Sequence, residues 1–157
     1  MSKVTPATRA LATAKVPFTV HTYDYDADAA RVGLQAAAEL GEDPARVLKT
    51  LMASVDGKPV CVIVPSDAEI SMKKLAAAFG GKSAQMMKPA DAERVTGYKV
   101  GGISPFGQRR PIETAIEQRA LAHEQVYLNG GQRGLQVRLS PADVRVVLKA
   151  RAADLIA

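Results

Sequence analysis

The stretch VLKTLMASV-DG-KPVCVIV, residues 47–64, decides the fold of this chain. Two mostly apolar runs, 47–55 and 59–64, flank the dipeptide Asp56-Gly57. Asp-Gly favours a two-residue hairpin turn because both of its positions tolerate positive φ. The sequence therefore predicts two paired antiparallel strands in the middle of the chain.

Short helices and strands are predicted on both sides of this hairpin. Helices are expected over 7–15, with Thr5 and Pro6 at the start, over 34–40, ending at Gly41, over 71–78 and 89–95, and after Ser140, where Asp143 completes a capping-box variant. Strands are expected at 18–23, 112–116, 126–128 and 135–139. Short strands interleaved with short helices predict a mixed or largely antiparallel sheet with helices packed around it.

Composition indicates a single globular domain over residues 1–157. The chain is 47% apolar, which is enough for one compact core. It has one cysteine, Cys61, so no intrachain disulfide is possible and a reducing compartment is favoured. The first residues lack the apolar core of a signal peptide, and no apolar run reaches the ~20 residues of a membrane span. We expect a soluble, cytoplasmic protein with no membrane partner.

The net charge of +5 lies entirely in the second half of the chain. Residues 1–78 carry nine basic and nine acidic side chains, whereas residues 79–157 carry twelve basic and seven acidic ones. An excess of cations suggests a polyanionic partner, although a charge of this size is also common on the solvated surface of ordinary enzymes.

Candidate metal ligands and nucleophiles are few. A metal site needs three or four well-spaced ligands, and the chain offers His21, His123 and Cys61 beside its carboxylates. We therefore expect neither a metal nor a cofactor. His21 is interpreted as a hydrogen-bonded sheet residue and Cys61 as an inert packing group. Ser104 has no neighbouring histidine, although spacing alone leaves a serine triad open.

For two features, the residues alone allow both a functional and a purely structural interpretation. Lys49 interrupts an otherwise apolar strand, so its ammonium either reaches past the sheet to water or points into a cleft and stabilises negative charge. The loop Gly101-Gly102-Ile103-Ser104-Pro105 is either a tight turn or a place where bare main chain approaches another molecule. Pattern alone does not decide between these alternatives.

Together, four motifs carry a family resemblance. They are HTY at 21–23, VLKTL at 47–51, GYxVGGISP at 97–105 and GGQRG at 130–134. In this order and spacing the chain resembles the YbaK family of bacterial Cys-tRNA(Pro) deacylases, single-domain relatives of the editing domain of prolyl-tRNA synthetase. The resemblance spans nearly the whole chain. It implies an α/β fold of the α+β type, with a mixed, largely antiparallel or barrel-like sheet surrounded by short helices.

The resemblance also implies a trans-editing enzyme that removes cysteine from proline tRNA. In this family the substrate's own thiol is thought to attack its ester carbonyl, so the protein needs only to position and polarise the ester. Carried over by position, Lys49 and Gly101 are the catalytic residues. The residues implied to bind substrate are Tyr23, Val32, Gly102, Ile103, Ser104, Pro105, Asn129, Gly130, Arg133 and Gln136. We expect Lys49, Arg109, Arg110 and Arg133 to contact the RNA.

Three positions depart from the family pattern and leave the substrate open. Gln136 stands where the well-studied type has an acidic residue, Asn129 where it has serine, and Val32 near an aromatic position. A deacylase for alanine or another small amino acid, or a catalytically silent RNA-binding module, are the alternatives. The expected partners are aminoacyl-tRNA, with tRNA(Pro) as the RNA, and prolyl-tRNA synthetase to select it; the oligomeric state is open.

Overall fold

The structure is a computed structural model that describes residues 4–25 and 32–157, with the side chains of the second stretch given from residue 34. The elements in chain order are α1 (Pro6–Ala14), β1 (Thr19–Thr22), α2 (Val32–Leu40), β2 (Leu48–Val55), β3 (Lys58–Pro65), α3 (Met72–Ala78), β4 (Ala84–Met86), α4 (Pro89–Thr96), β5 (Glu113–Glu117), η1 (Gln118–Ala122), β6 (Val126–Asn129), β7 (Leu135–Leu139), α5 (Pro141–Leu148) and β8 (Arg151–Ala153).

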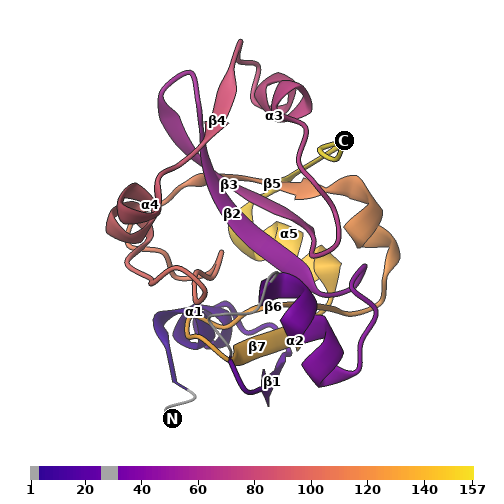
Figure 1. The fold of residues 1–157 in the computed structure, drawn as a ribbon. Helices are drawn as coiled ribbons and strands as arrows, with labels where there is room; N and C mark the ends of the chain where they lie inside the picture. Colours follow the sequence, from indigo (N-terminus) through magenta and orange to yellow (C-terminus); the bar gives the residue numbers. More distant parts are fainter. Residues whose placement is uncertain (1–3, 26–31) are drawn as a thin grey trace.

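The strands form two sheets rather than one (Figure 1). The larger sheet has the order β4-β2-β3-β5-β8; its β4, β2 and β3 are antiparallel neighbours, whereas β3, β5 and β8 run parallel. The smaller sheet, β1-β7-β6, is antiparallel throughout. Within the described residues, a bridge between Val47 and Tyr127 links the two sheets. The predicted α+β fold with a mixed sheet is confirmed, with the central sheet divided at that bridge.

The predicted hairpin forms at the expected place. Strands β2 and β3 pair from Leu48 opposite Pro65 to Val55 opposite Lys58. Asp56 and Gly57 have φ of 49° and 83°, as the tight turn requires. The Asp56 carboxylate also accepts the backbone N–H groups of Lys82 and Ser83, and these bonds lower the pKa of Asp56. The turn is therefore tied to the segment that leads into β4.

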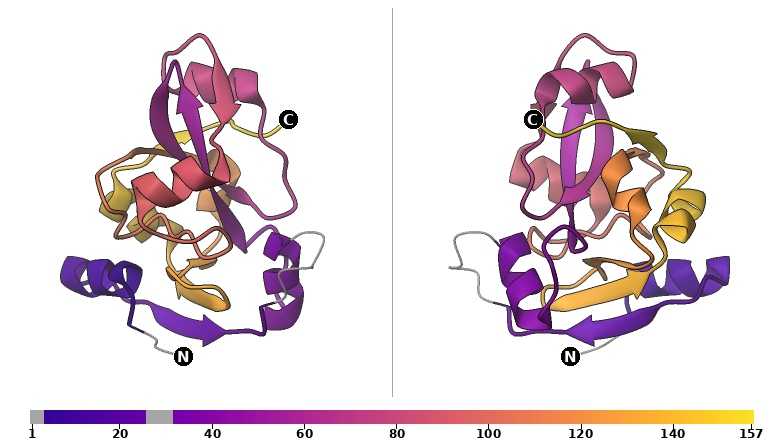
Figure 2. Two further views of the ribbon diagram at one scale, coloured as in Figure 1. Left: turned by 60° about the vertical axis from the view of Figure 1, so that its left-hand side comes forward. Right: turned by 90° about the vertical axis from the view of Figure 1, so that its right-hand side faces the viewer.

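Two main hydrophobic clusters fill the molecule. One joins α1 and α5 to both sheets and includes Leu11, Phe106 and Leu128, all fully buried. The other lies between α3, the larger sheet and the C-terminal residues, and includes Leu75 and Leu155. In Figure 2, α1 and β1 lie at one end of the molecule, and α3 and the C-terminus lie at the other end.

Helix starts follow the sequence with two differences in detail. Thr5 caps α1, and its side chain exchanges hydrogen bonds with Thr8 in a full capping box that the sequence analysis did not identify. At α5 the Ser140 hydroxyl accepts from the N–H of Ala142 at 3.2 Å. The reciprocal bond from Asp143 that would complete the expected capping-box variant is not part of that cap. One side-chain bond is enough to start this helix.

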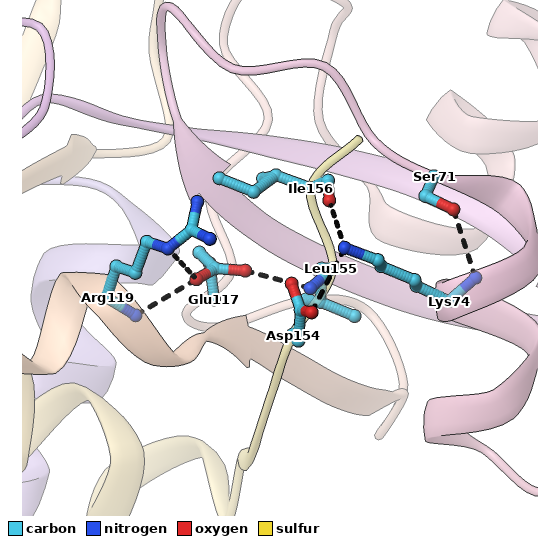
Figure 3. Close-up of polar contacts among 7 residues, drawn as sticks. All are labelled: Ser71, Lys74, Glu117, Arg119, Asp154, Leu155 and Ile156. Atoms are coloured by element: carbon cyan, nitrogen blue, oxygen red, sulfur yellow. Dashed lines mark hydrogen bonds and ion pairs between the residues drawn. The ribbon is translucent and has the colours of Figure 1, made fainter.

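Three short elements were not predicted: β4, η1 and β8. They are three to five residues long and depend on partners far away in the sequence. Behind β8, the segment 154–157 is held by the fully buried Glu117, whose carboxylate accepts the N–H groups of Leu155 (2.8 Å) and Arg119 (3.0 Å). Lys74 donates to the Ile156 carbonyl at 2.8 Å and pairs with Asp154 (Figure 3).

Candidate active site

A cavity of about 310 Å³ opens where the two sheets meet. Its wall combines β2 with the glycine loop after α4, the segment between β4 and α4, and the ends of β6 and β7. The lining residues are Tyr23, Ala36, Val47, Leu48, Lys49, Thr50, Leu51, Met52, Met86, Met87, Pro89, Ala92, Val100, Gly101, Ile103, Asn129 and Gln136.

The cavity borders an edge of β2 that is only partly paired. Strand β3 covers one edge along the whole of β2, whereas β4 pairs only with residues 53–55 on the other. The carbonyl of Met52 points to that second edge, because it accepts the N–H of Met87 at 3.1 Å. Peptide groups alternate between the two edges of a strand, so the N–H and carbonyl of Thr50 point the same way as those of Met52. The cavity wall therefore includes main-chain polar groups of Thr50.

Lys49 sets the charge of the cavity. Its half-buried side chain extends from β2 at the position opposite Val64. Of the described residues that line the cavity, Lys49 alone has a charged side chain. An ammonium group among apolar walls interacts more strongly with a developing negative charge than it would in water. The position of Lys49 in this lining favours the interpretation in which its ammonium points into a cleft.

Tyr23 and Gln136 supply neutral polar groups on another side of the cavity. The Tyr23 N–H donates to the Gly134 carbonyl at 2.9 Å, which fixes Tyr23 beside β7. Burial raises the pKa of the Tyr23 hydroxyl above its ordinary value, and a hydrogen bond with Gln136 offsets that rise only in part. The Tyr23 hydroxyl therefore stays protonated near neutral pH.

Two buried polar atoms of the lining residues have no hydrogen-bond partner within the described chain. They are Oε1 of Gln136 and Oγ1 of Thr50. Leaving such an atom unpaired costs on the order of 1–3 kcal/mol. Both atoms belong to residues of the same cavity, so a polar ligand there would offset that cost after a small side-chain adjustment.

The glycine loop is held in place by the β6–β7 loop. Gly101 has a φ of 91°, a conformation that favours glycine. The Asn129 side chain donates to the Gly101 carbonyl at 3.2 Å and accepts from the N–H groups of Gly131 (2.7 Å) and Gln132 (3.2 Å). One amide side chain therefore joins both loops and fixes the Gly101 wall of the cavity.

The structure brings six of the expected site residues to one cavity and places the others around it. Tyr23, Lys49, Gly101, Ile103, Asn129 and Gln136 line it. Within the glycine loop, Gly101 and Ile103 face the cavity, whereas Gly102 lines a neighbouring cleft and Ser104 is fully buried, with its hydroxyl accepting the Phe106 N–H.

The remaining expected residues lie outside the cavity lining. Pro105 is buried, and Gly130 is buried with its N–H donating to the Leu135 carbonyl. Arg133 lines the same neighbouring cleft as Gly102. Arg109 donates to the Arg94 carbonyl, and Arg110 lines a separate groove beside α4. The side chain of Val32 lies outside the described residues.

Sequence reasoning missed Thr50 and the methionine wall formed by Met52, Met86 and Met87. Thr50 adjoins Lys49 and could have been found by asking which strand edge is unpaired. Met86 and Met87 depend on the three-residue strand β4, which has no clear signal in the sequence.

The other candidate nucleophile and base are accounted for by packing. Burial raises the pKa of the Cys61 thiol to about 12, and the Gln108 amide approaches its sulfur at 3.8 Å. Cys61 is an inert core thiol, as predicted. His21 contacts the Thr19 hydroxyl at 2.8 Å and stacks edge-on against Tyr127, which confirms its interpretation as a hydrogen-bonded sheet residue.

Comparison with known proteins decides the family. Residues 27–146, most of the chain, match the aminoacyl-tRNA editing domain. The chain belongs to the aminoacyl-tRNA editing domain family. It is 34% identical over 140 residues to an Enterococcus faecalis protein named "Putative Cys-tRNA(Pro)/Cys-tRNA(Cys) deacylase EbsC", and the match covers 87% of this chain and 84% of that one. This editing domain is therefore an aminoacyl-tRNA deacylase, as the sequence analysis predicted.

A second group of relatives carries the editing domain inside a larger enzyme. The proline–tRNA ligase of Maridesulfovibrio salexigens is 32% identical over 95 residues, which cover 60% of this chain and 16% of the ligase. The editing domain thus corresponds to a small part of these ligases.

Solved structures share the fold at low sequence identity. One, of a hypothetical protein, has a TM-score of 0.88 at 21% identity and covers 98% of this chain and 100% of its own. Another, described as a "putative trans-editing enzyme for prolyl tRNA synthetase", has a TM-score of 0.80 at 20% identity and covers 98% and 99%. Within the described residues, no helix has the length and apolar content needed to cross a membrane.

Proposed function

We propose that this editing domain deacylates Cys-tRNA(Pro), with the cysteinyl group bound in the cavity beside β2. The observation that carries the proposal is that Lys49 and the Gly101 wall share one cavity. The apolar walls and the three methionine side chains suit a small sulfur-containing group, because thioethers make soft, adaptable contacts.

The proposed reaction uses the substrate's own nucleophile. The cysteinyl sulfur attacks the ester carbonyl carbon, a C–S bond forms, and the C–O bond to the terminal ribose breaks. The thiol proton passes to the departing ribose oxygen, so the products are a cyclic thiolactone and tRNA with a free hydroxyl. Holding the thiol and the ester together replaces the base and nucleophile that other hydrolases carry.

The protein's part is to stabilise the charge that develops on the carbonyl oxygen. The Lys49 ammonium and the main-chain N–H of Thr50 lie on the same stretch of β2 beside the cavity. An aimed donor of this kind contributes a factor of about 10²–10³ in rate. In this proposal Tyr23 and Gln136, both neutral, bind the polar groups of the aminoacyl moiety.

The test compares tRNA esters that differ only in the side chain of the amino acid. Purified protein is incubated with tRNA(Pro) carrying cysteine, 2-aminobutyrate, alanine, serine or proline, and ester loss and the small product are followed. We expect rapid loss of cysteine as thiolactone. The 2-aminobutyryl ester has a methyl group in place of the thiol, so it should bind the same cavity and react slowly. Lys49→Ala should lower kcat/KM for the cysteinyl ester about 10²-fold or more, whereas Lys58→Ala, at an exposed position on β3, should not.

Other outcomes select the alternatives. Equal cleavage of the cysteinyl and 2-aminobutyryl esters would show that water is the nucleophile. Faster release of alanine would make the chain an Ala-tRNA deacylase, which remains chemically accessible because an apolar pocket separates small side chains by only about 1–3 kcal/mol per methylene group. Stability of every ester would favour the non-catalytic RNA-binding module.

Selection of tRNA(Pro) is assigned in this proposal to prolyl-tRNA synthetase. Support comes from the proline–tRNA ligases that contain a related segment. Addition of the synthetase should raise the preference for Cys-tRNA(Pro) over Cys-tRNA(Cys). An unchanged preference would remove the synthetase from the proposal.

A further inference from the structure

A second hollow is lined by a neighbouring residue of the same glycine loop. This cleft, of about 350 Å³, includes Lys99, Gly102, Gly131 and Arg133 in its lining, and we call it the Lys99–Arg133 cleft. Gly101 lines the aminoacyl cavity and Gly102 lines the cleft. Consecutive Cα atoms are about 3.8 Å apart, so the two hollows approach each other at the glycine loop.

We propose that the Lys99–Arg133 cleft binds a phosphodiester group of the RNA 3′ end while the acyl group occupies the cavity. The inference rests on the proposed function, because it takes an acylated RNA end as the ligand. The acylated ribose and its nearest phosphate belong to the same nucleotide, so a ligand with its acyl group at Gly101 carries its first negative charge close to Gly102.

The charge of the cleft fits this ligand. Its described lining contains the two cations Lys99 and Arg133 and no carboxylate. The groove beside α4 contains three cations, Lys88, Arg94 and Arg110, but also the carboxylate of Asp91, which pairs with Arg94 at 2.9 Å. In the Lys99–Arg133 cleft an anion therefore meets positive charge that no lining carboxylate offsets.

Arg133 is oriented before any ligand binds. Its Nε donates to the Val100 carbonyl at 3.0 Å, and its guanidinium lies 5.4 Å from the centre of the Tyr25 ring. These contacts fix the guanidinium plane, and its terminal nitrogens have the geometry to hold two phosphate oxygens at once. A guanidinium that is already positioned loses less conformational entropy on binding than a flexible one.

Glycine residues bring the two loops of the cleft together. A Cβ on Gly102 would lie 2.8 Å from the backbone nitrogen of Arg133, and a Cβ on Gly131 would lie 2.9 Å from the Tyr98 ring. Glycine at both positions lets the two loops pack closely and fixes the shape of the cleft.

Binding of an RNA oligonucleotide that ends in CCA tests the proposal without requiring hydrolysis. Affinity is measured by fluorescence anisotropy at several salt concentrations. Lys99→Ala should weaken binding about three- to tenfold and reduce the slope of log K against log salt by about 0.7, the value for one phosphate of a single strand. Lys73→Ala serves as the matched control, because Lys73 is an exposed lysine on α3 at the far end of the molecule and should change neither quantity. Arg110→Ala tests whether the groove beside α4 binds the RNA instead.

Kinetics provide an independent readout. Lys99→Ala should lower kcat/KM for aminoacyl-tRNA several-fold more than kcat/KM for cysteine ethyl ester, which has no phosphate. Unchanged RNA affinity and salt slope in Lys99→Ala, or loss of both in Arg110→Ala alone, would overturn the proposal. If Lys99→Ala weakens RNA binding while no ester is cleaved, the cleft assignment stands and the proposed deacylation fails.

Discussion

At the scale of single residues, charge and burial separate the reactive groups from the inert ones. Lys49 and Cys61 both lie on the β2–β3 hairpin, and they differ in what surrounds them. Lys49 is half-buried at a cavity, where its charge can act on a ligand. Cys61 is fully buried in the centre of the larger sheet, where ionisation is penalised.

The Cys61 thiol should therefore be unreactive in the folded protein. With a pKa of about 12, it is thiolate in only about one molecule in 10⁴ at pH 8. We expect iodoacetamide at pH 8 to leave deacylation unchanged and to label Cys61 only after unfolding, as measured by mass spectrometry. Rapid labelling with loss of activity would place Cys61 in the mechanism.

The same shift predicts a pH dependence of stability. The unfolded chain loses the thiol proton near pH 9, whereas the folded chain holds it to about pH 12. Between these values the unfolded state binds fewer protons, so the free energy of unfolding falls as pH rises. In Cys61→Ala this decline should be smaller. The raised pKa of Tyr98, also about 12, adds a similar decline from its ordinary value of 10.0 upward.

At the scale of elements, the glycine loop depends on its backbone conformation and on the loop that supports it. A Cβ on Gly101 would lie 2.5 Å from the Tyr25 hydroxyl, and φ there is 91°. Gly101→Ala should therefore displace the wall of the cavity and lower kcat/KM at least tenfold. The methyl group meets Tyr25 and Arg133, so loop displacement adds to any direct clash with the ester.

Gly41→Ala is the matched control for Gly101→Ala. Gly41 also has a positive φ, of 67°, but a Cβ there would meet no atom within 4 Å. Its substitution should cost about 1 kcal/mol of stability in urea unfolding and leave kcat/KM unchanged. Wild-type activity in Gly101→Ala would show that the glycine loop is only a turn.

The elements also show how far the sequence determines the fold. The hairpin was predictable because Asp56-Gly57 specifies its turn locally. Strands β4 and β8 were not, because each is three residues long and is stabilised by a partner elsewhere in the chain. The family motifs predicted Lys49 and Gly101 as site residues, and both line the cavity. They did not show that Gly102 faces away from Gly101, which depends on how the β6–β7 loop packs.

At the scale of the whole molecule, the site and the C-terminal anchor are separate. The cavity lies where the two sheets meet, whereas the segment 154–157 packs beside α3 and β5 (Figures 1 and 3). Stability and activity should therefore respond to different substitutions. Glu117 provides the sharpest case, because its carboxylate is fully buried and accepts two main-chain N–H groups.

Glu117→Ala should destabilise the protein by about 2–4 kcal/mol, since it leaves the buried Leu155 N–H without its acceptor and opens a small void. Lys74→Ala removes a part-exposed bond to Ile156 and an ion pair with Asp154, and should cost about 1 kcal/mol or less. Urea unfolding of both variants measures the difference, and kcat/KM at a temperature where both are folded should match wild type. A Glu117→Ala protein that unfolds like Lys74→Ala would mean that water replaces the carboxylate. Loss of activity in folded Glu117→Ala would instead couple the C-terminal anchor to the cavity through β5.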